Sequence, residues 1–183
     1  LVVSGMVKLC RTAQGGQAHL FAIVGPADMF GECSVFDPGP RASSATAVTD
    51  VCAVVLDRDD VRSWMAGGPV IAERLMQVLP NRLRRADRDR SHLTFTDVTG
   101  RVAKLLLRLG HQFGVWEDGE IRVTHDFTQE ELGQLIGTCR TTVNKVLLGF
   151  CHRGWIRVDG RSFVINDADG LARAHRRRCG ATL

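Results

Sequence analysis

A short segment in the last third of the chain carries side chains that commonly hydrogen-bond to DNA. Arg140, Thr141, Thr142, Asn144 and Lys145 all lie between positions 140 and 145. Arginine and lysine bind guanine, asparagine binds adenine, and threonine reaches bases or phosphates. These residue types therefore predict a DNA-reading surface. Arg140 is the best candidate for a guanine contact, and Thr142 for a phosphate contact.

The residues just before this segment predict the helix-turn-helix that would present it. Thr128 and Glu131 have the spacing of a capping box, which starts a helix. Gly137 can adopt the positive φ of a tight turn, and a second helix follows from Cys139. In such a unit the N-terminal residues of the second helix enter the major groove. The alternative is an αα-hairpin with ordinary surface charges. The first helix should run through Glu131, Leu132, Leu135 and Ile136, and the second should have Val143, Val146, Leu147 and Phe150 facing inward.

Two predicted hairpins flank this pair of helices. Residues 115–124 have a turn at positions 117–119, and residues 155–165 have a turn at Asp159-Gly160. The second hairpin would form the wing of a winged helix, with Arg161 beside its turn. We therefore add Arg161 to the predicted DNA-binding residues, together with Thr128 and Cys139 at the starts of the two helices.

A long helix with one apolar edge is predicted upstream. Its heptad seam consists of Ala72, Met76, Leu79, Leu83, Ala86, Arg90 and Leu93, which recur at alternating steps of four and three. This spacing favours a two-stranded coiled coil, and hence a homodimer. Packing of the helix onto its own domain is the alternative. Pro80 lies inside the seam and should kink or break the helix, since an internal proline costs about 3 kcal/mol.

Asp97 is the predicted N-cap of the next helix, which should run from Val98 to about Gln112. The segment from Thr94 to Gly100 would then be the hinge between two domains. The inward-facing residues of this helix are expected to be Val102, Leu105, Leu106 and Leu109.

The N-terminal part of the chain reads as short β-branched strands separated by turns, which favours an antiparallel β-roll or barrel. Its first residues already resemble the middle of a strand, so we expect the opening strands to be absent. The predicted strands are Leu1 to Ser4, Val7 to Arg11, Ala18 to Val24, Ala42 to Thr49 and Val51 to Leu56. The fold class is therefore α+β, with a ligand-sensing roll (1–68), a dimerisation helix and hinge (69–96), and a winged helix-turn-helix (97–183).

Charge and composition agree with a sensing half joined to a DNA-binding half. Up to Leu79 the chain has 6 basic and 8 acidic residues, whereas after Leu79 it has 18 basic and 12 acidic residues. A basic half indicates a nucleic-acid partner, and a scaffold that used the roll alone would leave it unexplained. We find no signal peptide and no apolar run long enough to span a membrane, so we expect a cytoplasmic protein.

The pattern of reactive side chains argues against an enzyme. The six cysteines have no C-x-x-C pair and are expected to be reduced thiols, and the six histidines form no metal-spaced group. No nucleophile motif is present. We therefore expect no catalytic residues and no metal.

Three motifs together resemble the CRP/FNR family of regulators, particularly the actinobacterial cyclic-AMP receptor proteins. They are FGECSVFDPGPRASSAT, FTDVTGRVAKLL and QEELGQLIGTCRTTVNKVL. The resemblance covers nearly the whole chain. It implies a homodimer on a palindromic operator with RNA polymerase as a partner, and a cyclic nucleotide that tunes DNA affinity by shifting populations across the hinge.

The resemblance also implies a ligand site in the roll. Gly31 and Glu32 match the pair that engages the ribose, and Arg41 matches the arginine that pairs with the cyclic phosphate. A guanidinium can neutralise a phosphate, and glycine allows close backbone approach. The alternative is a simple ion pair between Glu32 and Arg41.

Other positions depart from the family pattern of the ligand site. The hydroxyl residue after the arginine is Ala42, and the helix positions that contact adenine are Ala86 and Asp87. Asp87 could still accept from an adenine amino group, and we include Arg82 of the same helix in the ligand set. Two lost hydroxyl contacts predict cyclic-AMP binding weakened by about tenfold or more. A constitutive regulator with a vestigial pocket is the alternative.

The recognition segment departs as well, because the family's usual Arg-Glu-Thr is Arg140-Thr141-Thr142 here. Without the carboxylate that accepts from cytosine, preference for the family half-site TGTGA should be shifted or relaxed. Cys139 replaces a residue that often offers a hydroxyl to DNA, and its place at a helix N-terminus favours the thiolate. Redox control through Cys139 is one hypothesis, and a small residue tolerated at a turn is the other. Iron–sulfur sensing finds no support in the cysteine spacing.

Overall fold

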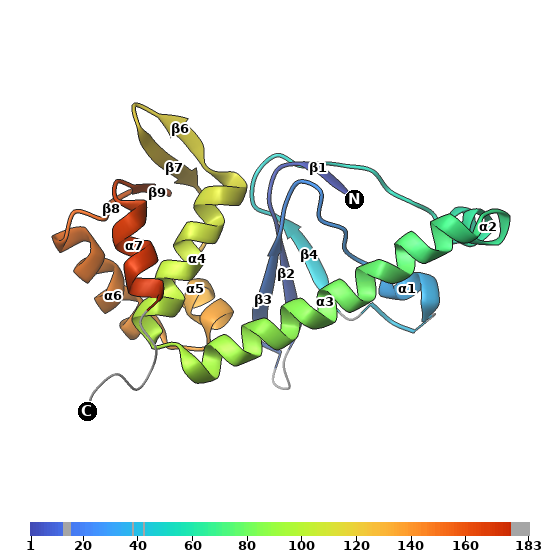
Figure 1. Cartoon of the computed structure of the whole chain (residues 1–183), viewed down its shortest axis with the longest axis horizontal. Helices are drawn as coiled ribbons and strands as arrows, with labels where there is room; N and C mark the ends of the chain where they lie inside the picture. The colour runs from blue at the N-terminus through green and yellow to red at the C-terminus, as the bar shows by residue number, and fades with distance from the viewer. Residues whose placement is uncertain (13–15, 38, 42, 177–183) are drawn as a thin grey trace.

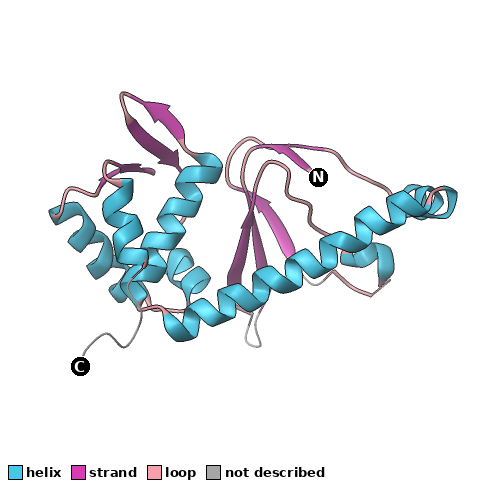
Figure 2. Ribbon diagram, in the orientation of Figure 1, coloured by secondary structure: helices cyan, strands magenta, loops and turns pink. Residues whose placement is uncertain are grey.

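The computed structural model describes residues 1–12, 16–37, 39–41 and 43–176, except for the side chains at positions 71, 75, 82, 85, 88, 89 and 92. It confirms the α+β class: a strand-rich roll and a winged helix-turn-helix are joined by a long helix (Figures 1 and 2). None of the described helices combines the length and apolar character needed to cross a bilayer.

The roll is built from short antiparallel strands. They are β1 (Val2–Ser4), β2 (Val7–Thr12), β3 (Ala18–Val24), β4 (Ser44–Ala47) and β5 (Cys52–Ala53). The sheet order is β3-β2-β4, and β1 pairs with β5. Each strand falls within or beside its predicted range, although β4 and β5 are shorter than expected. A short helix, α1 (Cys33–Phe36), lies between β3 and β4.

The long helix differs from the prediction at Pro80. α2 (Arg58–Gly67) ends before Gly68, and α3 (Pro69–Phe95) then runs without interruption through Pro80. The expected break is therefore wrong, and the expected kink stays a prediction. Pro80 and Met76 are both exposed, so water can hydrate the Met76 carbonyl that Pro80 leaves without its helical donor.

The C-terminal part begins as the sequence predicts. Asp97 caps α4 (Val98–Phe113), and its side chain accepts a 2.6 Å hydrogen bond from the Gly100 amide. The four residues expected to face inward on α4 are all buried. The remaining elements are β6 (Val115–Glu117), β7 (Glu120–Thr124), α5 (Gln129–Ile136), α6 (Arg140–His152), β8 (Ile156–Asp159), β9 (Ser162–Ile165) and α7 (Ala168–His175).

Both predicted hairpins form, and they join into one antiparallel sheet of order β6-β7-β9-β8. The final helix, α7, lies outside the sequence-based expectations. It packs along α4, and its Leu171 is completely buried. Asp167 caps it by accepting from the Gly170 amide at 2.7 Å.

One hydrophobic core spans the roll and the winged helix-turn-helix domain. One hydrophobic cluster includes Leu106 and Leu109 of α4 and Phe150 of α6, and it extends to Leu20 and Ile23 of β3. A smaller cluster within the roll contains Val2, Val7, Leu9 and Val24. The helix-turn-helix is thus held directly against the roll.

Candidate nucleic-acid interface and ligand cassette

The N-terminus of α5 has the predicted capping box. The Thr128 hydroxyl accepts from the Glu131 amide at 3.1 Å, and the Glu131 carboxylate accepts from the Thr128 amide at 2.9 Å. These two bonds satisfy backbone donors that would otherwise be unpaired at the helix start. α5 therefore begins at a fixed residue.

The turn between α5 and α6 depends on two glycines. Gly137 has φ of 66°, in the left-handed region that favours glycine. A Cβ on Gly133 would lie 2.5 Å from the Thr138 carbonyl oxygen, so no larger residue fits at this close approach. The glycines let the chain reverse tightly and set the angle between the two helices.

α6 separates a buried face from an exposed one. Val143, Leu147 and Phe150 are buried. The opposite face exposes Arg140, Thr141, Asn144 and Lys145, and Thr142 is half-buried. The structure therefore brings all five predicted recognition residues onto the first turns of one helix, where side chains can enter a major groove.

Asn144 already has a neighbour in α5. Its side-chain oxygen accepts a 3.2 Å hydrogen bond from Gln129. Bidentate binding of adenine uses the oxygen and the nitrogen of asparagine together. The amide oxygen can accept a second hydrogen bond, so Asn144 can hold the bond from Gln129 and still offer an acceptor and a donor to an adenine.

Cys139 is the exposed N-cap of α6. Its Sγ atom lies 3.1 Å from the hydroxyl oxygens of both Thr141 and Thr142. Hydrogen bonds from these two residues lower the pKa of Cys139 to about 7. A large share of this thiol is therefore thiolate at neutral pH, beside the predicted base-reading residues.

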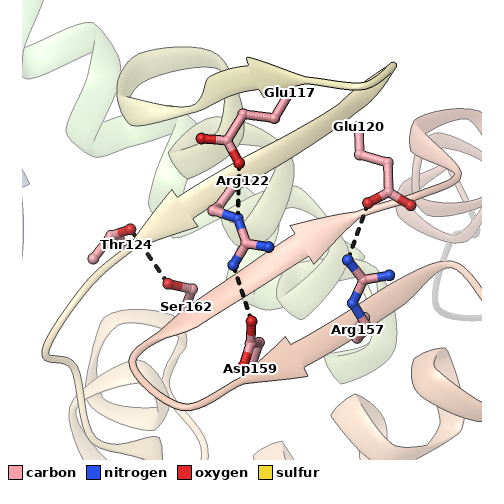
Figure 3. Close-up of polar contacts among 7 residues, drawn as sticks. All are labelled: Glu117, Glu120, Arg122, Thr124, Arg157, Asp159 and Ser162. Carbon is pink, nitrogen blue, oxygen red and sulfur yellow. Dashed lines mark hydrogen bonds and ion pairs between the residues drawn. The ribbon is translucent and has the colours of Figure 1, made fainter.

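Charged side chains on the four-stranded sheet β6-β7-β9-β8 form ion pairs between strands (Figure 3). Arg122 of β7 lies 3.1 Å from both Glu117 and Asp159, and Arg157 of β8 lies 3.1 Å from Glu120. Thr124 and Ser162 are joined by a 3.3 Å hydroxyl hydrogen bond. These contacts tie the two hairpins together and neutralise two arginines.

Arg161, the predicted wing residue, follows the turn between β8 and β9. It is largely exposed and forms a 3.0 Å ion pair with Asp126. Its carbonyl also accepts from the His125 amide at 2.7 Å. The wing turn is thereby anchored to the loop that precedes α5, close in the chain to Thr128.

The cassette, residues 31–41 of the roll, brings three of the predicted ligand residues together. Gly31 has φ of 80°, and Glu32 is buried, with its carboxylate 3.7 Å from the Cys33 thiol. Arg41 donates to the Gly31 carbonyl at 3.2 Å and to the Ser34 hydroxyl at 2.6 Å. The Arg41 guanidinium therefore contacts the start of the cassette through Gly31 and Ser34.

Ser34 is a residue that the sequence reasoning missed. Its hydroxyl donates to the Gly31 carbonyl at 2.8 Å while it accepts from Arg41. The signal was present, because Ser34 lies two residues after Glu32 within the quoted motif.

Two further positions of the predicted ligand site, Ala86 and Asp87, lie on α3. Asp87 is exposed on α3 and lies 3.9 Å from Arg90, one turn away on the same helix. Ala86 is also exposed. Ala42 and the side chain of Arg82 lie outside the described residues.

Comparison with known proteins connects both regions to one family. A cyclic nucleotide-binding domain model matches residues 1–67, and a Crp-like helix-turn-helix domain model matches residues 100–174. A CRP-like cAMP-activated global transcriptional regulator from Mycobacterium tuberculosis is 56% identical over 176 residues, covering 96% of this chain and 79% of the relative. The chain belongs to the CRP/FNR family.

Other relatives of this CRP/FNR chain include the cyclic AMP receptor protein of Thermus thermophilus. It is 38% identical over 168 residues, covering 92% of this chain and 74% of the relative. The crystal structure of a CRP/FNR-family transcriptional regulator from the same organism has a TM-score of 0.80 at 28% identity. That match covers 97% of this chain and 87% of the other. This CRP/FNR protein is accordingly a DNA-binding transcription regulator and not an enzyme.

Proposed function

We propose that this protein acts as a homodimer on a palindromic DNA site and that a cyclic nucleotide, with cyclic AMP as first candidate, controls its DNA affinity. The proposal keeps the three-part division into roll (1–68), dimerisation helix and hinge (69–96) and winged helix-turn-helix (97–183). The exposed face of α6, with Arg140, Thr141, Asn144 and Lys145, is the observation that supports DNA binding by this helix.

Apolar exposure on α3 supports the dimer. Four seam residues expose between 42% and 65% of their surface: Met76, Leu79, Leu83 and Leu93. Unpaired leucines at heptad spacing lose this exposure when a second helix packs against them. Leu83→Glu should therefore give a monomer by sedimentation, and a dimeric variant would contradict this part of the proposal.

The geometry of the cassette supports an anionic ligand. Arg41 has an exposed guanidinium, and the positive φ of Gly31 allows backbone approach. Two relatives are named for cyclic AMP, which makes this nucleotide the first to test. RNA polymerase is the proposed protein partner, and the cytoplasm the proposed location, since a regulator acts where its DNA is transcribed.

Titration calorimetry with cyclic AMP and cyclic GMP, with and without operator DNA, tests ligand control. We expect heat of binding for one nucleotide and a matching change in DNA affinity, because coupling between two sites is reciprocal. Arg41→Ala should abolish the heat. Binding of DNA with no heat and no nucleotide effect would leave a constitutive regulator with a vestigial pocket.

Redox modulation is a second candidate, favoured by the exposed Cys139 thiol with its pKa of about 7. Oxidation or alkylation of a group at the start of α6 would place new bulk where DNA approaches. DNA affinity should fall after peroxide or iodoacetamide treatment and should be preserved in Cys139→Ser. Unchanged affinity after full alkylation would exclude this candidate.

A further inference from the structure

A pocket of about 150 Å³ is lined by residues of β3, α3, α4 and α5, and its lining shares no residue with the cassette or with the exposed face of α6. Apolar side chains form part of this lining. Leu105 and Ile136 are buried, Leu135 is half-buried, and Phe21 and Leu93 expose 42% and 47% of their surface. Apolar cavities of about this volume accept a molecule of the size of benzene. The pocket therefore has room for one aromatic ring.

The rest of the lining is cationic. Arg101, Lys104 and Arg108 follow one another at steps of three and four along α4, so they lie on one face of the helix. α4 contains no acidic residue, and none of the described residues that line the pocket is acidic. Like charges at this spacing destabilise a helix, and an anion beside them reduces that cost.

Arg101 makes the demand for an anion specific to this pocket. Its Nη1 atom donates to the Leu93 carbonyl at 2.9 Å and to the Thr96 carbonyl at 3.3 Å. Its Nε atom is buried and has no hydrogen-bond acceptor among the described residues. Neutral carbonyls carry no charge to balance the guanidinium, whereas a carboxylate does. The pocket thus combines apolar side chains with an incompletely balanced positive charge.

Next to the pocket, two polar contacts join the roll to α5. The Leu20 amide donates to the Gln134 side chain at 2.7 Å, and the Lys8 ammonium lies 2.7 Å from the Glu131 carboxylate. The residues that come directly after Leu20 and Gln134 in the chain both line the pocket. The pocket is therefore formed before a ligand enters, which lowers the free-energy cost of binding.

We propose that this pocket binds a small aromatic carboxylate, with its ring against Leu105 and Ile136 and its carboxylate against the cations of α4. The ring removes apolar surface from water, and the carboxylate accepts charge-assisted hydrogen bonds. The site is separate from the cassette that contains Arg41, so the inference goes beyond the proposed function and does not depend on it.

The probe is sodium benzoate, added to the full chain without DNA or nucleotide. The measurement is two-dimensional NMR of the leucine and isoleucine methyl groups. We expect the methyl signals of Leu105, Leu135 and Ile136 to shift with a Kd on the order of 1 mM. Absence of any shift of these signals up to about 20 mM benzoate, some twenty times that Kd, overturns the proposal.

Two related compounds separate the parts of the ligand. Benzyl alcohol keeps the ring without the charge, and acetate keeps the charge without the ring. Each should bind at least about tenfold more weakly than benzoate, because each lacks one of the two interactions. Equal binding of acetate would mean general attraction of anions, and equal binding of benzyl alcohol would mean that the cations play no part. Either result overturns the proposal.

Variants locate the site. A Lys104→Ala, Arg108→Ala double variant should bind benzoate about tenfold more weakly, because it loses two charged hydrogen-bond donors. Arg62→Ala is the matched control, since it removes an exposed cation from α2 and should leave benzoate binding unchanged. Arg41→Ala removes the guanidinium of the cassette and should leave it unchanged as well. Undiminished binding by the double variant, or loss of binding in Arg41→Ala, overturns the assignment to this pocket.

Urea denaturation of the unmodified chain gives an independent result. A ligand that binds only the folded protein stabilises it by mass action. Benzoate at about ten times its Kd should raise the urea midpoint, and sodium acetate at the same concentration should not. An equal response to the two salts overturns the proposal, because a general salt effect would then account for the stabilisation.

Discussion

The Sγ atom of Cys139 lies 3.1 Å from the hydroxyl oxygen of Thr141, at the first turn of α6. Thr142 makes the same contact one residue further on. Both bonds stabilise the thiolate, so the pKa of Cys139 falls to about 7. The local geometry of the recognition helix thus makes this cysteine more nucleophilic at neutral pH than an ordinary thiol.

Thr141→Val should raise the pKa of Cys139, because it removes the strongest of the bonds that stabilise the thiolate. The iodoacetamide reaction rate of Cys139, followed by peptide mass spectrometry between pH 5.5 and 9, should have its midpoint near 7 in the unmodified protein. The variant's midpoint should be higher. Thr124→Val, which removes a threonine hydroxyl from β7, should leave the midpoint unchanged, and an identical shift in both variants would refute the assignment.

His125 predicts a pH dependence of folding stability. Burial lowers its pKa and outweighs the opposing effect of Asp126, and its Nδ1 accepts from the Phe127 amide at 3.0 Å. The unfolded chain therefore binds this proton more readily than the folded chain. Stability should fall as the pH drops below about 6.5, by at most about 1.4 kcal/mol per pH unit, until the lowered folded pKa is passed.

Urea denaturation at pH 7.5 and 5.5 measures this effect. His125→Asn offers an acceptor oxygen in place of Nδ1 but cannot titrate, so the loss of stability between the two pH values should be smaller in the variant. His152→Asn, in the last turn of α6, is the matched control. Equal losses in all three proteins would show that another group causes the dependence.

Arg140→Ala should weaken specific DNA binding by about 1–3 kcal/mol and relax the preference at one base pair, because Arg140 is the predicted bidentate contact to guanine. Arg62→Ala removes the same charge from an exposed site on α2 and should change affinity little. Binding to an operator and to its single-base variants at fixed salt separates the two effects. A uniform loss across all sequences would make Arg140 a phosphate contact instead.

Thr141 predicts an altered operator. Selection from random DNA should recover half-sites with relaxed discrimination at the base pair that a glutamate at position 141 is expected to read, because a threonine hydroxyl can accept or donate. Thr141→Glu should restore a sharp preference at that position. Recovery of TGTGA by the unmodified protein with undiminished discrimination would contradict the prediction.

Local signals explain what the sequence could predict. The capping box of Thr128 and Glu131, the Asp97 cap and the Gly137 turn each depend on residues a few positions apart, so their spacing alone indicates the structure. The α7 helix had such a signal as well, in the cap that Asp167 makes to Gly170, and it was overlooked.

The contacts between the roll and the helix-turn-helix leave no comparable pattern. Lys8 and Glu131 are 123 positions apart, and each alone is an ordinary surface charge. Leu20 uses its backbone amide, which every strand residue possesses, so nothing in its side chain marks the bond to Gln134. The roles of the DNA-binding and ligand-binding residues themselves stay predictions.

Pro80 gives the last prediction, which concerns the continuous helix α3. Because proline lacks an amide hydrogen, the Met76 carbonyl has lost its helical donor, and hydration at this exposed site offsets only part of the cost. Pro80→Ala should therefore stabilise the protein, by about 1–3 kcal/mol in urea denaturation. Pro69→Ala is the matched control, because Pro69 is the first residue of α3, where no helical acceptor exists for its amide. It should change stability by no more than a few tenths of a kcal/mol. Stabilisation by both alanines alike would mean that the gain comes from general helix propensity and not from the hydrogen bond restored to Met76.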